Sequence, residues 1–534
     1  MSTVLARADV STTRFEKLIQ DRVANKTFMG SVLVAKGDEV IFDKSYGSAN
    51  LEWDVPNTPD TKFRVGSVTK QFTAASILLL QEHGKLSIDD PVKKYFTDAP
   101  PAWDKITLFH LLTHTSGIPS YTDVPNVMEL VAQPTTPRKL IDSFKSKSLL
   151  FEPGTKWKYS NSGYIVLGYI IEKVSGVTYQ RFLDENIFKP LGMKDSGYDS
   201  NTQIIKCRAS GYESRGGTFQ NAPYIDMSET YSAGSIYSTT HDLLRWERAL
   251  FGAKLLSQAS LQKMTTPFKD EYGFGLFIRN LNGRREIEHG GDINGFNTDM
   301  AFWPDDQLTV IALGNVNGFA PDGIVRDLSA SAHGEQVTAA SERKEITLAP
   351  DALKPYVGRY DTDQAPGMHL DITLEKVHLE AQLSGQPKFP IFAESPTRFF
   401  WKVVDAQIDF AKDASGKVTG GTLHQAGRDL PWKKTSDEIP AVQHKEITLT
   451  PEQMSALARA YQVAAGTEMN ITVDNGHLYG QITGQPKFEL FAESPTHLFL
   501  KVVDAQMDFD LDASGKATKF TLHQGGRDSV WTRE

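Results

Sequence analysis

The sequence is poor in cysteine, in long apolar runs and in positive charge. Its 534 residues include one cysteine, Cys207, which excludes an intrachain disulfide framework and a multi-cysteine metal site. No run of about 18 apolar residues occurs, so no segment is predicted to span a membrane as a helix. The 57 Lys and Arg residues are outnumbered by 66 Asp and Glu, for a net charge of −9. The basic footprint of a nucleic-acid-binding protein is therefore missing.

The N-terminal residues leave the location of the protein open. Ala6-Arg7-Ala8 resembles the small-residue end of a signal peptide, but no apolar core precedes it. We expect the protein to be extracytoplasmic, either periplasmic or secreted, if a native signal peptide was removed, and cytoplasmic otherwise. A short disordered tail explains the same residues equally well.

The C-terminal part of the chain contains two copies of one module. Gly385–Phe410 and Gly484–Phe509 share 20 of 26 positions, at an offset of 99 residues. The similarity extends to Trp432 and Trp531 at the ends of the copies. Short β-branched and aromatic runs separated by turns predict that each copy is a small antiparallel β-barrel.

These patterns predict three domains. Residues 1–335 form the first, and the two barrels, expected to be lipocalin-like, occupy residues 345–436 and 446–534. The barrels have begun to diverge, because Tyr356-Val-Gly-Arg-Tyr360 in one corresponds to Leu457-Ala-Arg-Ala-Tyr461 in the other.

The first 335 residues carry strand patterns at both ends and helical patterns between them. The expected strands are Ser31–Ala35, Val40–Ser45, Tyr272–Ile278, Met300–Trp303 and Thr309–Leu313, and the expected outer helices are Arg14–Asn25 and Pro321–Ala332. This order predicts an α/β domain with a helical lobe, and a cleft between the lobe and the sheet.

The first chemical motif is Ser67-Val68-Thr69-Lys70. Ser67 is expected to open an apolar helix that runs to about His83, and residues at i and i+3 share a helix face. Burial would lower the pKa of Lys70, so that a neutral amine could take the Ser67 proton. Alone, an N-cap serine beside a solvated lysine explains the motif as well.

Two further motifs carry groups with suitable chemistry. In Tyr159-Ser160-Asn161, a phenol close to an ammonium loses its proton more easily and can pass a proton to a leaving group, while the amide can hold a carbonyl or the lysine. In His289-Gly290-Gly291, two glycines let a substrate backbone lie against a strand edge. By themselves, a packed aromatic residue and a glycine turn are sufficient explanations.

Together, the order and spacing of S-x-x-K, Y-S-N and H-G-G resemble the serine β-lactamase and penicillin-binding protein superfamily, in its class C-like branch. The resemblance covers about residues 12 to 335. It implies an antiparallel sheet flanked by helices plus a helical lobe, and neither metal nor another cofactor. Supporting stretches are Phe63–Ser67, Leu111–Ile118, Glu152–Gly154, Asn161–Tyr164, Pro190–Met193 and Tyr272–Gly275.

The resemblance assigns a role to each matched residue. Ser67 would be the acylated nucleophile, Lys70 and Tyr159 would share the general base and acid work, and Asn161 would orient the substrate and the lysine. These roles describe a serine hydrolase that acts through an acyl-enzyme.

The third motif marks a departure from many relatives. His289, with Gly290 and Gly291, would occupy the place of the K-T-G lysine, and the backbone N–H groups of Ser67 and Asp292 would form the oxyanion hole. Histidine is mostly neutral at pH 7, so a preference for β-lactams or for peptides ending in a carboxylate is less expected.

The whole layout resembles the D-stereospecific aminopeptidases, in which a C-terminal barrel narrows the specificity of the cleft. The expected partner is thus a small-molecule, peptide or ester substrate, and a homodimer is left open. Alternatives on the same site are a carboxylesterase, a β-lactamase or an acyl transferase. An alternative of another class is a non-hydrolytic, penicillin-recognising binder or sensor.

Other candidate groups favour structural roles. His110 and His114 are expected as an i, i+4 pair on one helix, but Leu111 stands where a zinc protease of the H-E-x-x-H type needs glutamate. Cys207 is interpreted as an inert thiol, and the repeated His424 and His523 as structural residues of the barrels.

Overall fold

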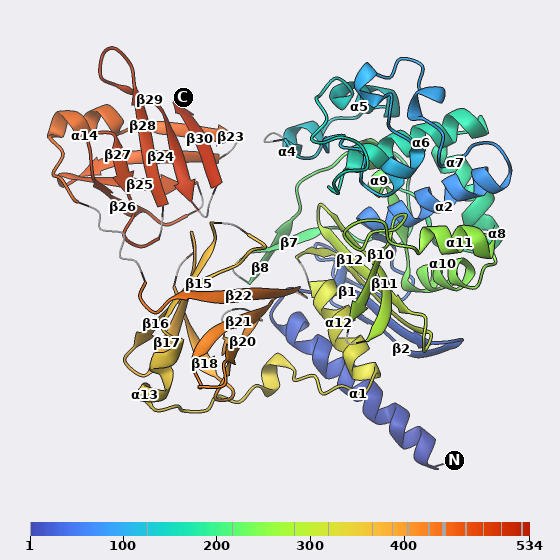
Figure 1. Cartoon of the computed structure of the whole chain (residues 1–534), viewed down its shortest axis with the longest axis horizontal. Coiled ribbons are helices and arrows are strands. Elements are labelled where there is room, and N and C mark those ends of the chain that lie inside the picture. The colour runs from blue at the N-terminus through green and yellow to red at the C-terminus, as the bar shows by residue number, and fades with distance from the viewer. Residues whose placement is uncertain are drawn as a thin grey trace. The chain divides into compact units, whose positions relative to one another are not determined.

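The computed structural model describes residues 2–124, 127–215, 217–281, 283–318, 320–365, 367–386, 388–402, 404, 406–425, 428–439, 445–464, 467–483, 485–503, 505–524 and 527–533. The chain divides into two compact units, Met1–Glu342 and Arg343–Glu534 (Figure 1).

A six-stranded antiparallel sheet organises the first unit. Its strand order is β10-β11-β12-β13-β1-β2, with bounds Phe277–Leu281, Arg284–Ile293, Phe296–Trp303, Leu308–Gly314, Gly30–Lys36 and Glu39–Tyr46. The prediction of a strand from Tyr272 onward is wrong, because β10 begins at Phe277. Gly275 instead adopts a φ of +69°, and a Cβ there would lie 2.6 Å from the carbonyl oxygen of Lys70. The turn thus packs directly on the helix that carries the lysine.

Two helices cover one face of this sheet. They are α1 (Ser2–Ala24), which begins earlier than expected, and α12 (Ala320–Ala332) (Figure 1). Side chains alternate between the faces of a strand, so Val32 and Val34 pack with these helices while Leu33 and Ala35 face the other way. The sheet is therefore buried on both sides.

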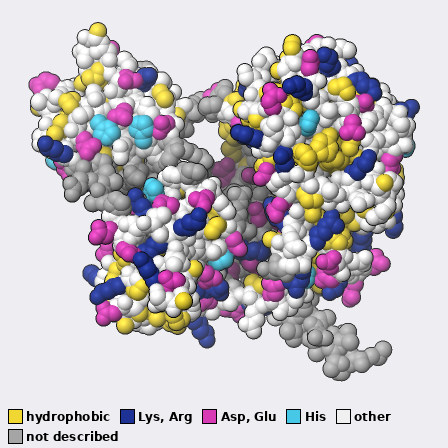
Figure 2. Space-filling model, in the orientation of Figure 1, with side chains coloured by type: hydrophobic (Ala, Val, Ile, Leu, Met, Phe, Trp, Pro, Cys, Tyr) yellow, Lys and Arg dark blue, Asp and Glu magenta, His cyan; other side chains and the backbone are white. Residues whose placement is uncertain are grey.

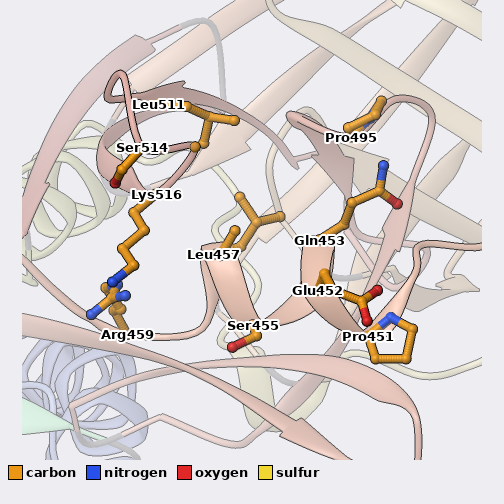
Figure 3. Close-up of a pocket in the computed structure, with 12 residues that line it drawn as sticks. Pro451, Glu452, Gln453, Ser455, Leu457, Arg459, Pro495, Leu511, Ser514 and Lys516 are labelled. Atoms are coloured by element: carbon orange, nitrogen blue, oxygen red, sulfur yellow. The ribbon is translucent and has the colours of Figure 1, made fainter.

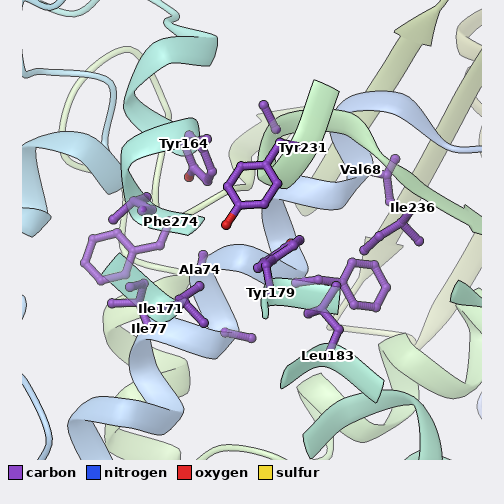
Figure 4. Packing of buried hydrophobic residues seen from close by; sticks show 14 of the residues in the cluster. Val68, Ala74, Ile77, Tyr164, Ile171, Tyr179, Leu183, Tyr231, Ile236 and Phe274 are labelled. Atoms are coloured by element: carbon purple, nitrogen blue, oxygen red, sulfur yellow. The ribbon is translucent and has the colours of Figure 1, made fainter. Parts of the chain in front are cut away.

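The opposite face packs against a helical lobe. Its centre is the short 3-10 turn η1 (Gly66–Val68), followed by α2 (Thr69–Glu82), whose first twelve residues are all buried. Figure 4 shows side chains from this helix, from α6 and from α9 converging in one core. The helices of the lobe and its neighbours are α3 (Leu108–Leu112), α4 (Val127–Leu130), α5 (Pro137–Phe144), α6 (Asn161–Ser175), α7 (Tyr179–Leu183), α8 (Lys189–Leu191), α9 (Met227–Gly234), α10 (Thr240–Phe251) and α11 (Gln258–Met264).

Short strands outside the main sheet tie the connecting segments together. One small sheet has the order β14-β7-β8, another the order β5-β9-β6, and β3 pairs with β4. Their bounds are β3 (Ser48–Asn50), β4 (Val55–Pro56), β5 (Phe63–Arg64), β6 (Gly197–Tyr198), β7 (Tyr212–Arg215), β8 (Thr218–Asn221), β9 (Ile236–Ser238) and β14 (Val316–Asn317).

The second unit contains two closed antiparallel barrels of eight strands each, which confirms the predicted fold class. After α13 (Pro350–Leu353), the first barrel comprises β15 (Gly358–Asp361), β16 (His369–Glu375), β17 (His378–Leu383), β18 (Phe389–Ala393), β19 (Arg398–Trp401), β20 (Ala406–Lys412), β21 (Val418–Gln425) and β22 (Arg428–Ser436). After α14 (Pro451–Leu457), the second comprises β23 (Ala460–Ala464), β24 (Thr467–Asp474), β25 (His477–Ile482), β26 (Phe488–Ala492), β27 (His497–Phe499), β28 (Ala505–Leu511), β29 (Ala517–Gln524) and β30 (Arg527–Arg533).

The surface agrees with the composition. Among the residues that the structure describes, no helix combines the length and the apolar character needed to cross a membrane. On the face drawn in Figure 2, basic and acidic side chains are interspersed over both units. That face therefore offers no broad positive field to a polyanion.

Candidate active site

Ser67 and Lys70 lie at the start of the buried helix of the lobe. Ser67 belongs to η1 and Lys70 to the first turn of α2, so the serine precedes the α-helix that it was expected to open. The Lys70 Nζ lies 2.9 Å from the Ser67 Oγ, within hydrogen-bond distance. The i, i+3 spacing thus brings the two groups together as predicted.

The surroundings of Lys70 favour its neutral form. The side chain is fully buried, and burial holds its pKa well below the ordinary value of 10.5. Its Nζ also donates to Asn161 Oδ1 and to the carbonyl oxygen of Ala233, both at 2.9 Å. A neutral amine has two N–H donors and one lone pair. When the two carbonyl oxygens take the donors, the lone pair is left for the Ser67 hydroxyl.

Tyr159 lies close to both Lys70 and Ser67. It precedes α6, and its ring centroid is 4.8 Å from the Lys70 Nζ. Burial raises the pKa of the Tyr159 phenol, while its hydrogen bond with Ser67 acts in the opposite direction. The expected lowering of this pKa is wrong, because the burial of the phenol outweighs its hydrogen bond with Ser67. Tyr159 therefore holds its proton in the resting site.

Asn161 is fixed by contacts that the sequence reasoning missed. Its Nδ2 donates to Thr122 Oγ1 at 3.1 Å, and its backbone N–H donates to Ser120 Oγ at 3.2 Å. The Asn161 Oδ1 is thereby aimed at Lys70. The only indication of these contacts in the sequence is that Ser120 and Thr122 lie shortly after the Leu111–Ile118 stretch of the resemblance.

His114, for which the sequence favoured a structural role, lies at the base of the site. The helix α3 ends at Leu112, and His114 has a φ of +56°, so the predicted helical pair with His110 is wrong. The His114 Nδ1 accepts the backbone N–H of Ser160 at 3.2 Å, and its ring centroid is 4.3 Å from that of Tyr159. Burial holds its pKa well below the ordinary value of 6.5.

His289 lies within β11 and is almost fully buried. Its Nδ1 is 2.6 Å from the carbonyl oxygen of Gly290, which can only accept, so Nδ1 carries the proton. The Nε2 then accepts from the Tyr272 hydroxyl at 3.1 Å. Burial lowers the pKa of His289 to about 3. The side chain is neutral and presents no fixed cation.

The backbones of η1 and β11 approach each other closely beside Ser67. A Cβ on Gly291 would overlap the carbonyl oxygen of Val65 and lie 3.0 Å from the Ser67 nitrogen. A Cβ on Gly66, where φ is +50°, would lie 2.9 Å from the Asp292 nitrogen. Two glycines are therefore required for the amides of Ser67 and Asp292 to come near each other, which is the arrangement that an oxyanion hole needs.

The free edge of β11 begins at the same point. Pairing between β10 and β11 ends at Phe277 and Glu288, so residues 289–293 extend beyond the neighbouring strand. On its other side, β11 stays paired with β12 as far as Ile293. An extended substrate segment could therefore add to this edge, next to the serine.

A cavity of about 160 Å³ opens in front of Ser67. Polar lining comes from Ser67, Thr122, Asn161, Thr230, Asp292 and Asn294, and apolar lining comes from Tyr121, Val127, Met128, Val131, Ile225 and Ile293. Among the described residues, no group of three or more His, Cys, Asp or Glu side chains is placed to hold a metal ion. The cavity thus offers a serine hydroxyl, backbone amides and an apolar wall.

The fold and this site define a serine hydrolase of the β-lactamase and penicillin-binding protein superfamily. The chain belongs to the Beta-lactamase family, whose model matches residues 15–334. A second family model, a domain of unknown function (DUF3471), matches residues 342–435 and 443–533.

Several known proteins are similar to this chain in sequence or in structure. The putative penicillin-binding protein PbpX of Bacillus subtilis is 35% identical over 302 residues, which are 56% of this chain and 74% of that protein. The octameric penicillin-binding protein homologue of Pyrococcus abyssi has a TM-score of 0.58 at 26% identity, covering 79% of this chain and 99% of its own. D-amino acid amidase from Ochrobactrum anthropi, in complex with L-phenylalanine, has a TM-score of 0.53 at 26% identity, covering 60% and 98%.

Proposed function

We propose that the protein is a D-stereospecific aminopeptidase or amidase that hydrolyses amide bonds through an acyl-enzyme on Ser67. The observation that carries this proposal is the fully buried Lys70, whose Nζ lies 2.9 Å from the Ser67 Oγ and whose pKa burial holds well below its ordinary value. Such a lysine is a general base at neutral pH.

In the acylation step, the Ser67 Oγ attacks the substrate carbonyl carbon and its proton moves to the Lys70 Nζ. The negative charge that develops on the carbonyl oxygen is stabilised by the N–H groups of Ser67 and Asp292. Asn161, fixed by Ser120 and Thr122, keeps the lysine directed at the serine.

The leaving amine then needs a proton. The Tyr159 phenol, protonated in the resting site, gives its proton to the amine nitrogen as the carbon–nitrogen bond breaks, and the Lys70 ammonium returns a proton to Tyr159. In deacylation, a water molecule attacks the ester and gives a proton to Lys70, and Ser67 leaves with its proton restored.

Two features support an amide with a small apolar side chain as the substrate. His289 is neutral, so the H-G-G edge offers no cation to a terminal carboxylate. The cavity of about 160 Å³ is small and has an apolar wall. The O. anthropi relative, named as a D-amino acid amidase, has the activity that this combination favours.

A substrate panel tests the proposal. D-Ala-p-nitroanilide, L-Ala-p-nitroanilide, a p-nitrophenyl ester and nitrocefin are offered to the full chain and to Ser67→Ala. We expect turnover of the D-anilide above the L-anilide and its loss in the variant. Preferred turnover of the ester or of nitrocefin would assign the site to a carboxylesterase or to a β-lactamase. Acylation of Ser67 without turnover, seen by mass spectrometry, would assign it to a binder or sensor.

Homo-oligomerisation is a second proposal. The P. abyssi homologue is described as octameric, and the sequence leaves a homodimer open. Light scattering coupled to size exclusion would give the number of chains, and a mass of one chain across the concentration range would rule out a stable oligomer.

A further inference from the structure

The end of the second barrel that carries α14 contains a cavity of about 750 Å³ (Figure 3). It is bounded by this helix, by the turn between β26 and β27 and by the turn between β28 and β29. The lining includes Glu452, Leu457, Arg459, Pro495, Leu511 and Lys516. All of the lining residues belong to the second barrel and its helix.

The first barrel shows what fills the equivalent space. There, Tyr356 is fully buried and its ring centroid lies 5.1 Å from that of Phe399 and 4.8 Å from that of Phe410. Its hydroxyl donates to the carbonyl oxygen of Pro396. The second barrel has Leu457 at the position of Tyr356. The phenol ring that reaches across the end of the first barrel is thus absent from the second.

Neighbouring substitutions enlarge the same space. Lys412 lies over the Tyr356 ring at 4.9 Å, and its counterpart is the shorter Leu511, which lines the cavity. Pro495, the counterpart of Pro396, also lines it. Phe520 replaces Gly421 and packs 5.0 Å from Tyr461, so aromatic volume is regained elsewhere in the barrel and not in the cavity.

The second barrel also gains a cation at this end. Arg459 stands where the first barrel has Gly358, and Ala456 replaces Pro355. Without that proline the helix α14 continues to Leu457, whereas the first barrel changes from α13 to a 3-10 turn before Tyr356. The backbone that carries Arg459 therefore follows its helix with a different conformation from that of the equivalent backbone in the first barrel.

Among the described residues, the positive side chains of the cavity form no ion pairs. The Arg459 Nε is buried and has no hydrogen-bond partner. In the part of the chain that the structure describes, neither Arg459 nor Lys516 forms an ion pair, whereas Lys417, the counterpart of Lys516, lies 3.7 Å from Asp437. In the view of Figure 3, Arg459 and Lys516 lie on one side of the cavity and Glu452 on the other.

We propose that this cavity binds a small amphipathic monocarboxylate, which is a molecule with one carboxylate and a short aliphatic chain. The Arg459 guanidinium matches a carboxylate in shape and charge, and Lys516 adds a second donor. Leu511 and Pro495, whose side chains are exposed, receive the aliphatic part. The volume lies within the range of small-molecule sites. Glu452 repels a second carboxylate, so dicarboxylates are excluded.

Calorimetric titration of the full chain with hexanoate tests the site, with hexanamide as the uncharged comparison. We expect one hexanoate per chain and binding of hexanamide that is weaker by about tenfold or more. Arg459→Gln should weaken hexanoate binding by about the same factor, because the charge-assisted hydrogen bonds are lost. Leu457→Tyr, which restores the residue of the first barrel, should abolish binding by filling the cavity.

The duplicated module supplies a matched control. Lys417→Gln alters the equivalent turn of the first barrel and should leave the affinity for hexanoate unchanged, while Lys516→Gln should reduce it. Thermal unfolding of every variant shows whether the fold is retained. Failure of hexanoate to saturate a site, or equal affinity in Arg459→Gln and the unsubstituted protein, would overturn the proposal.

Discussion

The Lys70 Nζ lies 2.9 Å from the Ser67 Oγ and equally far from two oxygens that can only accept, Asn161 Oδ1 and the carbonyl of Ala233. No carboxylate neutralises this lysine among the described residues. The cost of burying a charge is therefore avoided by losing the proton. One arrangement of neutral acceptors thus favours the neutral form of the Lys70 amine and also directs its lone pair toward Ser67.

Burial of a neutral lysine makes the stability of the protein depend on pH. The unfolded chain holds a proton on Lys70 up to about its ordinary pKa of 10.5, whereas burial in the folded chain makes this residue lose its proton at a lower pH. Stability contributed at this residue therefore rises with pH between the lowered pKa of the folded chain and about 10.5, by up to about 1.4 kcal/mol per pH unit. Lys70→Met lacks this dependence.

Urea unfolding at pH 7, 8 and 9 measures the effect as the difference in unfolding free energy between the unsubstituted protein and Lys70→Met. The difference should move in favour of the lysine as the pH rises. Lys85→Met removes an exposed lysine of the same lobe and should give a constant difference. Parallel curves for Lys70→Met would mean that the buried lysine keeps its proton.

The two glycines of the H-G-G motif should differ sharply in their tolerance of a methyl group. Gly291→Ala forces a Cβ into the carbonyl oxygen of Val65 and toward the Ser67 nitrogen, whereas a Cβ on Gly290 meets nothing closer than 3.5 Å. We expect Gly291→Ala to lower kcat by about 10²-fold or more, as loss of an oxyanion donor does. Gly290→Ala should stay within about threefold of the unsubstituted enzyme. Equal rates in the two variants would contradict the assigned oxyanion hole.

Local patterns predicted much of the architecture. Strand alternation located β1, β2, β12 and β13, and the repeat located both barrels, because each of these depends on residues close in sequence. The strand expected from Tyr272 begins only at Phe277, and the reason lies in a tertiary contact. Gly275 packs against the backbone of Lys70, a contact between segments 200 residues apart that no local pattern reveals.

The site divides in the same way. The pair Ser67 and Lys70 could be predicted from helical spacing, and the motif order brought in Tyr159 and His289. The direction in which the pKa of Tyr159 shifts could not be predicted, since it depends on the burial of the phenol. Thr122 and His114 also escaped prediction, because their roles arise from hydrogen bonds to other segments.

A lysine at position 289 should change which substrates the enzyme prefers. His289 is neutral and bonded to Tyr272, so His289→Lys adds a cation near the free edge of β11. We expect kcat/KM for a D-Ala-D-Ala peptide, relative to D-Ala-p-nitroanilide, to rise by about tenfold, because the peptide ends in a carboxylate. His289→Gln, which adds no charge, is the control. The same ratio in both variants would show that this position does not face the carboxylate.

His114 should act on the rate through Tyr159, as a positioning residue. Its Nδ1 accepts the N–H of Ser160, the residue between Tyr159 and Asn161, and its ring packs against the phenol. His114→Phe keeps an aromatic ring but leaves that buried N–H unpaired, at a cost of about 1–3 kcal/mol in stability. We expect kcat to fall by about tenfold while KM changes by less than about twofold, because His114 does not line the cavity.

Two variants separate this effect from a loss of packing. His114→Asn restores an acceptor at a similar distance from the backbone and should recover most of kcat. His110→Phe removes the capping interaction of α3 with Thr107 and should cost stability without changing kcat. Steady-state kinetics and thermal unfolding of the three variants give both quantities. If His114→Phe loses stability but keeps its kcat, the histidine supports the fold alone.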